Sequence, residues 1–220
     1  MVGPAQTSDD LADDPRLAAA LRAGAAGRRL VNALIASGAP AEVLDAAAAD
    51  LDRLAETLEP FAVQSRYAGT DGLSVIKFRD PAVAAHHPLL GNANPIAPPL
   101  VVEDRDDGWV TLTGRYDKRA EGMPGLVHGG LLAMAFDLAL GVASSAVFQR
   151  PAMTGTLTLK YRAPTPLWQD VVYRAHAEPR SERTVDATGT LHVGDTLCVE
   201  AEGIWVALKH DLVPPVEVGE

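Results

Sequence analysis

The spacing of apolar residues changes near residue 100, from helical repeats to alternation. Two alanine-rich segments come first. One begins near Pro15 and ends at Ser37-Gly38, since proline suits the first turn of a helix and glycine the position after its end. The other runs from Pro40 to Pro60, with apolar residues at steps of three and four. We expect both to be helices that pack against the main domain or a second subunit.

From residue 100 onward, apolar and polar residues alternate, which is typical of strands with one face on a core. The alternating segments lie around 110–114, 157–161, 171–176, 185–193 and 197–205. Gly194-Asp195 predicts a tight hairpin between the last two. Two shorter strands are expected around 61–66 and 73–78, and the proline-rich passage over 86–99 is expected to be irregular.

The most apolar segment runs from Leu131 to Phe148, and its only ionisable residue is Asp137. A carboxylate near its centre adds roughly 2.5–3.5 kcal/mol to membrane insertion, so we expect no membrane span but a helix buried on all sides in a soluble core. A buried carboxylate is costly unless it finds partners or does chemistry. The helix opens directly behind His128-Gly129-Gly130, where free backbone amides favour negative charge. Together these features predict an acyl-transfer centre.

The order of the elements predicts the α+β class, with an antiparallel sheet wrapped around one long central helix. We expect residues 100–210 to form this domain. Residues 1–99 would be an N-terminal helical extension with the irregular loop, and residues 211–220 a C-terminal tail.

Composition narrows the function classes. The formal net charge of −10 argues against nucleic acid as the main partner, because phosphate binding needs clustered cations. A single cysteine excludes an internal disulfide and fits a reducing compartment. The acidic first thirty residues lack a long apolar core, so we expect no secretory signal and a cytoplasmic location. His86-His87 has no third ligand at a recognisable spacing, so no metal site is predicted.

Two motifs resemble those of one known family. The segments EGMPGLVHGG (121–130) and MTGTLTLKYRAP (153–164) are similar to those of hotdog-fold acyl-CoA thioesterases of the PaaI type and their mammalian thioesterase-superfamily relatives. In that family an acidic residue stands eight positions after the first glycine, which is Asp137 here. The resemblance covers residues 100–208, and NANPIAPP (92–99) is similar to a leader segment of some bacterial members.

The resemblance implies a role for each matching residue. Asp137 would act as general base or as nucleophile, and the amides of Gly129 and Gly130 would stabilise the oxyanion. His128 would orient the turn and contact the acyl carbonyl, and Thr154 would hold the attacking water. Candidate substrate-binding residues are Thr156, Asn94 and Arg162.

The same resemblance implies the partners. The substrate would be acyl-CoA or an acyl-carrier thioester, as in fatty acid metabolism, and no cofactor is expected beyond the coenzyme A of the substrate. The sites of the family lie between paired subunits, so we expect a homodimer or a dimer of dimers, with Asp137 of one subunit facing Thr154 of the other.

Several alternatives stay open. Many PaaI-type enzymes have an asparagine about six residues before the histidine, where this chain has Gly122. If they have no catalytic role, Asp137 would be a structural carboxylate and Thr154 an ordinary strand residue. The competing functions are a non-catalytic acyl-CoA-binding hotdog protein and a hotdog hydratase or dehydratase.

Overall fold

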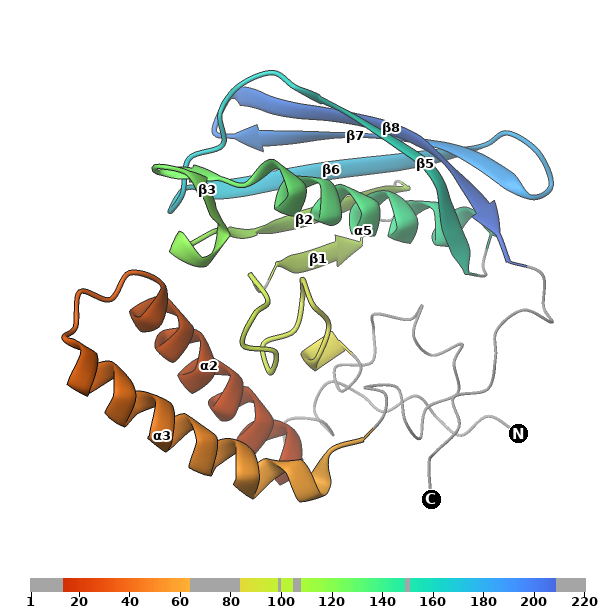
Figure 1. Ribbon diagram of the computed structural model, residues 1–220. Coiled ribbons are helices and arrows are strands. Elements are labelled where there is room, and N and C mark those ends of the chain that lie inside the picture. Colours follow the sequence, from red (N-terminus) through yellow and green to blue (C-terminus); the bar gives the residue numbers. More distant parts are fainter. Residues whose placement is uncertain (1–13, 64–83, 99, 105–107, 149–150, 209–220) are drawn as a thin grey trace, which may run out of the picture.

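A long helix lies across one face of a six-stranded antiparallel sheet (Figure 1). This computed structural model describes residues 14–63, 84–98, 100–104, 108–148 and 151–208. The helix is α5 (Gly129–Phe148), and the strand order is β1-β2-β6-β7-β8-β5. The strands are β1 (Val101–Asp104), β2 (Trp109–Arg115), β5 (Ala152–Tyr161), β6 (Asp170–Pro179), β7 (Thr184–Val193) and β8 (Thr196–Ala207). The predicted α+β architecture, a sheet around one long helix, is confirmed.

Two local predictions can be compared directly. Gly194 joins β7 to β8 with a φ of 54°, as the predicted hairpin requires. Phe61, by contrast, closes the short helix η1 (Glu59–Phe61) and does not open a strand. The other expected strand positions, from residue 64 on, lie outside the described residues.

The core forms between α5 and the sheet. The rings of Phe136 and Tyr173 meet edge to face, with 5.0 Å between their centroids. Gly189 on β7 lets the helix approach, because a Cβ there would stand 3.3 Å from Phe136 and 2.7 Å from the carbonyl oxygen of Arg174. The hydroxyls of Tyr116 and Tyr173 lie 2.8 Å apart. Burial raises the pKa of both phenols, so this buried pair stays neutral.

The expectation that α5 is buried on all sides is wrong. Eight of its residues are buried against the sheet: Leu132, Ala135, Phe136, Leu138, Ala139, Leu140, Ala143 and Ser144. On its other face Met134, Asp137 and Val147 are exposed. The reason is that the sheet of one protomer covers only one side of the helix. Among the described helices α5 alone is long and apolar enough to cross a membrane, a test that core helices also pass.

Two helices and a small hairpin complete the described chain. The helices are α2 (Pro15–Ile35) and α3 (Ala41–Leu58), close to the predicted bounds, and the hairpin pairs β3 (Glu121–Met123) with β4 (Leu126–Val127). Proline opens α2, and the carboxylate of Asp14 accepts the amide of Arg16 as its N-cap. No residue of α3 is buried, so its predicted packing partner is not found among the described residues.

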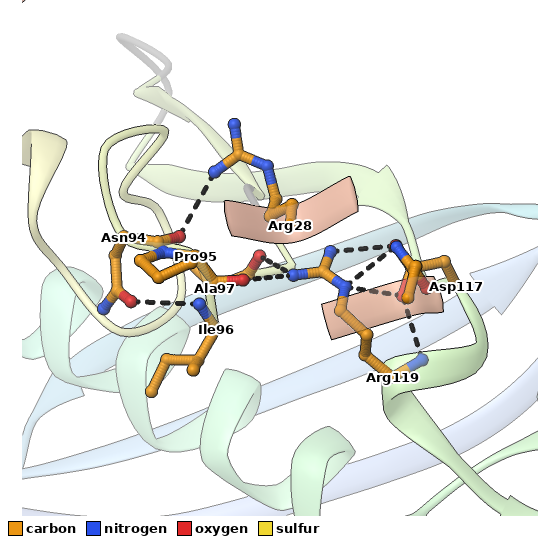
Figure 2. Close-up of polar contacts among 8 residues, drawn as sticks. Arg28, Asn94, Pro95, Ile96, Ala97, Asp117 and Arg119 are labelled. Carbon is orange, nitrogen blue, oxygen red and sulfur yellow. Dashed lines mark hydrogen bonds and ion pairs between the residues drawn. The ribbon is translucent and has the colours of Figure 1, made fainter. Parts of the chain in front are cut away.

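A cluster of polar side chains, which we call the anchor cluster, joins α2 to the domain. Its members are Arg28, Asn32, Asp117 and Arg119. Figure 2 shows Arg119 between Asp117 and the carbonyl oxygens of Pro95 and Ala97, which it reaches at 2.6 and 3.2 Å. Asn32 of α2 donates to Asp117 at 3.0 Å, and Arg28 donates to the loop carbonyl of Asn92 at 2.6 Å. Asp117 and Arg119 thus bind the helix and the 84–98 loop to the short helix η3 (Lys118–Ala120).

The charge state of Asp117 matters for this cluster. Burial by itself raises the pKa of its carboxyl, but hydrogen bonds from Arg119 and Asn32 and the charge of Arg119 outweigh burial and hold the pKa below its usual value. Such a carboxylate adds stability that is complete above its unfolded pKa of about 3.9 and is lost as the pH falls through the lower folded pKa.

Replacing Asp117 by Asn should therefore lower stability at neutral pH. The side chain of Arg119 is only 10% exposed, and its guanidinium would lose its counter-charge. We expect the free energy of unfolding at pH 7 to fall by about 1–3 kcal/mol and the difference from wild type to shrink below about pH 4. Urea unfolding across this pH range measures both. Asp50→Asn, which breaks an exposed pair with Arg53, serves as the control, and equal stability of Asp117→Asn and wild type at pH 7 would contradict the prediction.

Candidate active site

A hydrogen bond between two side chains joins the central helix to the edge strand. The hydroxyl of Thr154 on β5 donates to Asp137 Oδ1 on α5 at 2.5 Å. Among the described residues, no other hydrogen bond or ion pair reaches this carboxylate, so Oδ2 is free to accept a proton. Both residues are exposed in the protomer.

Two predictions about this pair need correction. Asp137 is not buried within one chain, because it lies on the face of α5 that the sheet leaves uncovered. Asp137 also does not need Thr154 of a partner subunit, because the two side chains form a hydrogen bond within the same chain. The predicted pairing of these two side chains is nevertheless present, and their catalytic roles remain predictions.

A β-bulge turns Thr154 toward the helix. Opposite β8, Thr154 pairs with Trp205 and Thr156 pairs with Ile204, so Gly155 is an extra residue in β5. Strict alternation would place Thr154 on the outer face of the sheet together with Thr156, whereas one inserted residue reverses its direction. The Thr156 hydroxyl accepts the amide of Ile204 at 3.2 Å beside this bulge. Thr156 is therefore part of the bulge that aims Thr154.

Within the described residues, the His-Gly-Gly turn leaves one amide without a hydrogen bond. The amide of Gly130 donates to His128 Nδ1 at 2.9 Å, so in the neutral imidazole the proton is on Nε2. The backbone amide of His128 donates to the carbonyl of Ala120 at 2.8 Å. No hydrogen bond from the Gly129 amide is found within the described part of the chain. Of the two predicted oxyanion donors, Gly129 is thus the one available to a ligand.

Tyr161 was missed by the sequence analysis as a site residue. Its hydroxyl donates to the carbonyl oxygen of Gly129 at 2.9 Å. The sequence contained one sign of this position, because Tyr161 shares the core-facing parity of Leu157 and Leu159 at the end of β5.

The glycine at position 122 has a steric cause. A Cβ at Gly122 would stand 2.7 Å from His128 Cα and 2.9 Å from His128 Cβ. The strand β3 therefore approaches the His128 backbone too closely for an asparagine at this position.

The predicted substrate-binding residues do not gather around Asp137 in one protomer. Asn94 stabilises its own loop, where its side chain accepts the amide of Ile96 at 3.1 Å and its carbonyl accepts from Arg28 at 3.2 Å. Arg162 pairs with Glu200 at 2.5 Å and lines a groove of about 430 Å³ on the outer face of the sheet. Within the described residues no group of three His, Cys, Asp or Glu side chains is placed to hold a metal ion.

The sheet, the central helix and the His-Gly-Gly turn define a hotdog-fold protein. A crystal structure of a thioesterase superfamily protein shares 31% identity and a TM-score of 0.73 with this chain, and the match covers 85% of this chain and 94% of that one. The chain belongs to the hotdog thioesterase superfamily, as the motif resemblance predicted.

Curated relatives match over a shorter region. Acyl-coenzyme A thioesterase THEM4 from Mus musculus is 32% identical over 90 residues, which are 40% of this chain and 38% of that protein. The protein of the same name from Bos taurus is 31% identical over 90 residues, or 40% and 36%. The match thus spans about two fifths of the length of these relatives. No family model matches the chain.

Deleting Gly155 should remove the bulge and leave the Thr154 hydroxyl directed at Asp137. With the extra residue gone, Thr154 directly precedes Thr156, and adjacent residues of a regular strand face opposite sides of the sheet. Thr154 should therefore stay opposite Trp205 on the helix side, while Thr156 stays on the outer face. A crystal structure of the variant measures the distance between Thr154 Oγ1 and Asp137. The control is Gly155→Ala, which keeps the residue count and asks only for a small shift, since its Cβ would stand 3.1 Å from the Ile204 carbonyl. A deletion variant with Thr154 on the outer face would show that its pairing opposite Trp205 does not set its direction.

Proposed function

We propose that this chain hydrolyses acyl-CoA or acyl-carrier thioesters to a free acid and a thiol. The observation that carries the proposal is the hydrogen bond between Thr154 and Asp137, which leaves one carboxylate oxygen free beside a hydroxyl. The naming of THEM4 as an acyl-coenzyme A thioesterase supports the substrate class. A thioester carbonyl is electrophilic enough for water, a base and an oxyanion donor to suffice, so we propose no cofactor beyond coenzyme A itself.

In this proposal Asp137 is the general base. The Thr154 hydroxyl donates a hydrogen bond to Oδ1, so its oxygen lone pairs can accept a hydrogen bond from the attacking water and hold it beside Oδ2. Oδ2 takes a proton as the water oxygen bonds to the carbonyl carbon. The carbon–sulfur bond then breaks, and the proton passes to the departing thiolate. Both side chains sit on rigid elements, which limits reorganisation during the reaction.

The oxyanion donor comes from a second copy of the chain. Gly129 and Asp137 are eight residues apart, or about 12 Å along the axis of α5, too far to act on one carbonyl carbon. Two-fold pairing of the β5 edge strands is antiparallel, so it lays the Tyr161 end of one copy beside the Thr154 end of the other. The Gly129 amide lies at that Tyr161 end and would then face the partner's acid.

Two features of the protomer support such a homodimer. The edge of β5 is ten residues long, and an open edge of that length is a liability that pairing removes. The exposed apolar residues Met134 and Met153 lie on the two elements that carry the site, and a partner would cover them.

Asp137→Asn should remove hydrolysis but not folding. Loss of the base should lower kcat by about 10²–10⁴-fold in a free-thiol assay over a panel of acyl-CoA lengths. Thr154→Val should also lose activity and Thr154→Ser should keep most of it, since serine retains the hydroxyl. Asp170→Asn, an exposed acid paired with Arg115, is the matched control and should stay active.

Two outcomes would overturn this function. Wild-type protein that binds acyl-CoA without releasing thiol would be a binding protein. Protein that hydrates a crotonyl thioester but leaves the thioester bond intact would be a hydratase.

A further inference from the structure

Both ends of the peptide between Gly129 and Gly130 are held by side chains. Its carbonyl oxygen accepts the Tyr161 hydroxyl at 2.9 Å, and its N–H donates to His128 Nδ1 at 2.9 Å. The peptide lies in the first turn of α5, where the Gly130 N–H has no partner within the helix, and a glycine on each side adds backbone freedom. The two hydrogen bonds, one at each end of the peptide, restrain its orientation.

These contacts also orient the neighbouring peptide, between His128 and Gly129. The carbonyl of His128 accepts the amides of Leu131 and Leu132 at 3.0 and 3.4 Å, as the first turn of α5 forms. The N–H of the same peptide belongs to Gly129, for which no hydrogen bond is found among the described residues. Because both flanking groups are fixed, this N–H points in one direction before any substrate arrives.

Tyr161 also explains why residue 129 lacks a side chain. A Cβ on Gly129 would stand 3.2 Å from the Tyr161 hydroxyl oxygen and 3.3 Å from its ring carbons. The phenol therefore occupies the space beside the turn. It reaches there from β5, the same strand whose other end carries Thr154.

We propose that Tyr161 is a positioning residue for thioester hydrolysis, a role that rests on the proposed function. Together with His128, it locks the Gly129–Gly130 peptide and so orients the Gly129 amide as the oxyanion donor. A preorganised donor stabilises developing charge without reorganisation, and a freely rotating one loses part of that effect. Tyr161 touches neither the water nor the reacting carbonyl, so its contribution should appear in kcat.

Tyr161→Phe tests this role, because it keeps the ring and removes only the hydroxyl. Loss of one such hydrogen bond should lower kcat roughly tenfold, with KM changed less than about twofold. Thr158→Val, which removes a hydroxyl from the outer face of the same strand, is the matched control and should match wild type. Size-exclusion chromatography and thermal unfolding check that both variants keep the oligomer and the fold.

A second measurement does not depend on activity. In wild type at a pH where the imidazole is neutral, the ¹⁵N shifts of His128 should show Nδ1 without a proton and Nε2 with one. In Tyr161→Phe the freed peptide should loosen, so the Nδ1 shift should move toward a mixture of tautomers and the Gly130 amide should exchange faster with solvent. Thr158→Val should leave both unchanged.

The outcomes separate this inference from the proposed function. An unchanged kcat in Tyr161→Phe would overturn the positioning role. A fall in kcat that comes with a lower unfolding temperature would also overturn it, because the loss would then reflect a damaged fold. Unchanged His128 shifts and Gly130 exchange would overturn the lock. If wild type hydrolyses no thioester, the proposed function fails and the positioning role fails with it, whereas the His128 and Gly130 measurements still show whether the lock exists.

Discussion

The hydrogen bond from Thr154 to Asp137 ties the central helix to the edge strand, and the proposed chemistry depends on it. It requires two independent features of the fold. The rotation of α5 must leave Asp137 on the uncovered face, which follows from Phe136 and Leu140 packing toward Gly189. The inserted Gly155 must turn Thr154 to that same face. Neither feature alone brings the acid and the hydroxyl to 2.5 Å.

Much of the fold was predictable because burial imposes periodicity. The alternation around 171–193 identified β6 and β7, and the proline and glycine positions bounded α2. The exposure of Asp137 was not predictable in the same way. An apolar composition indicates that a helix is covered, but it does not show whether its own chain covers every side. The bulge left one sign, since an isolated glycine within a strand often marks one, but Gly155 alone does not show which neighbour is turned. The sequence shows glycine and not asparagine at position 122. The cause is the close approach of strand β3 to His128, which only the folded structure reveals.

The His-Gly-Gly turn is held from several directions. The carbonyl of Ala120, at the end of η3, accepts the His128 amide, and the anchor cluster fixes that same short helix to α2 and to the 84–98 loop. Tyr161 reaches the turn from the edge strand. Helix α2 therefore contacts the element next to the His-Gly-Gly turn, although it lies outside the sheet (Figure 1). Rigidity of this turn matters because a single backbone donor acts only if its direction is fixed.

The central claim is that each site combines Asp137 of one protomer with the Gly129 amide of its partner, and mixed dimers test it most directly. Asp137→Asn removes the acid, and Gly129→Pro removes the amide at a first-turn position that suits proline, although its Cβ requires the Tyr161 phenol to shift. Each parent should be inactive yet dimeric. After subunit exchange at equal amounts, half of the dimers hold one intact site, so about one quarter of the wild-type rate should return. A mixture no more active than its parents, with exchange confirmed, would contradict a site shared between protomers.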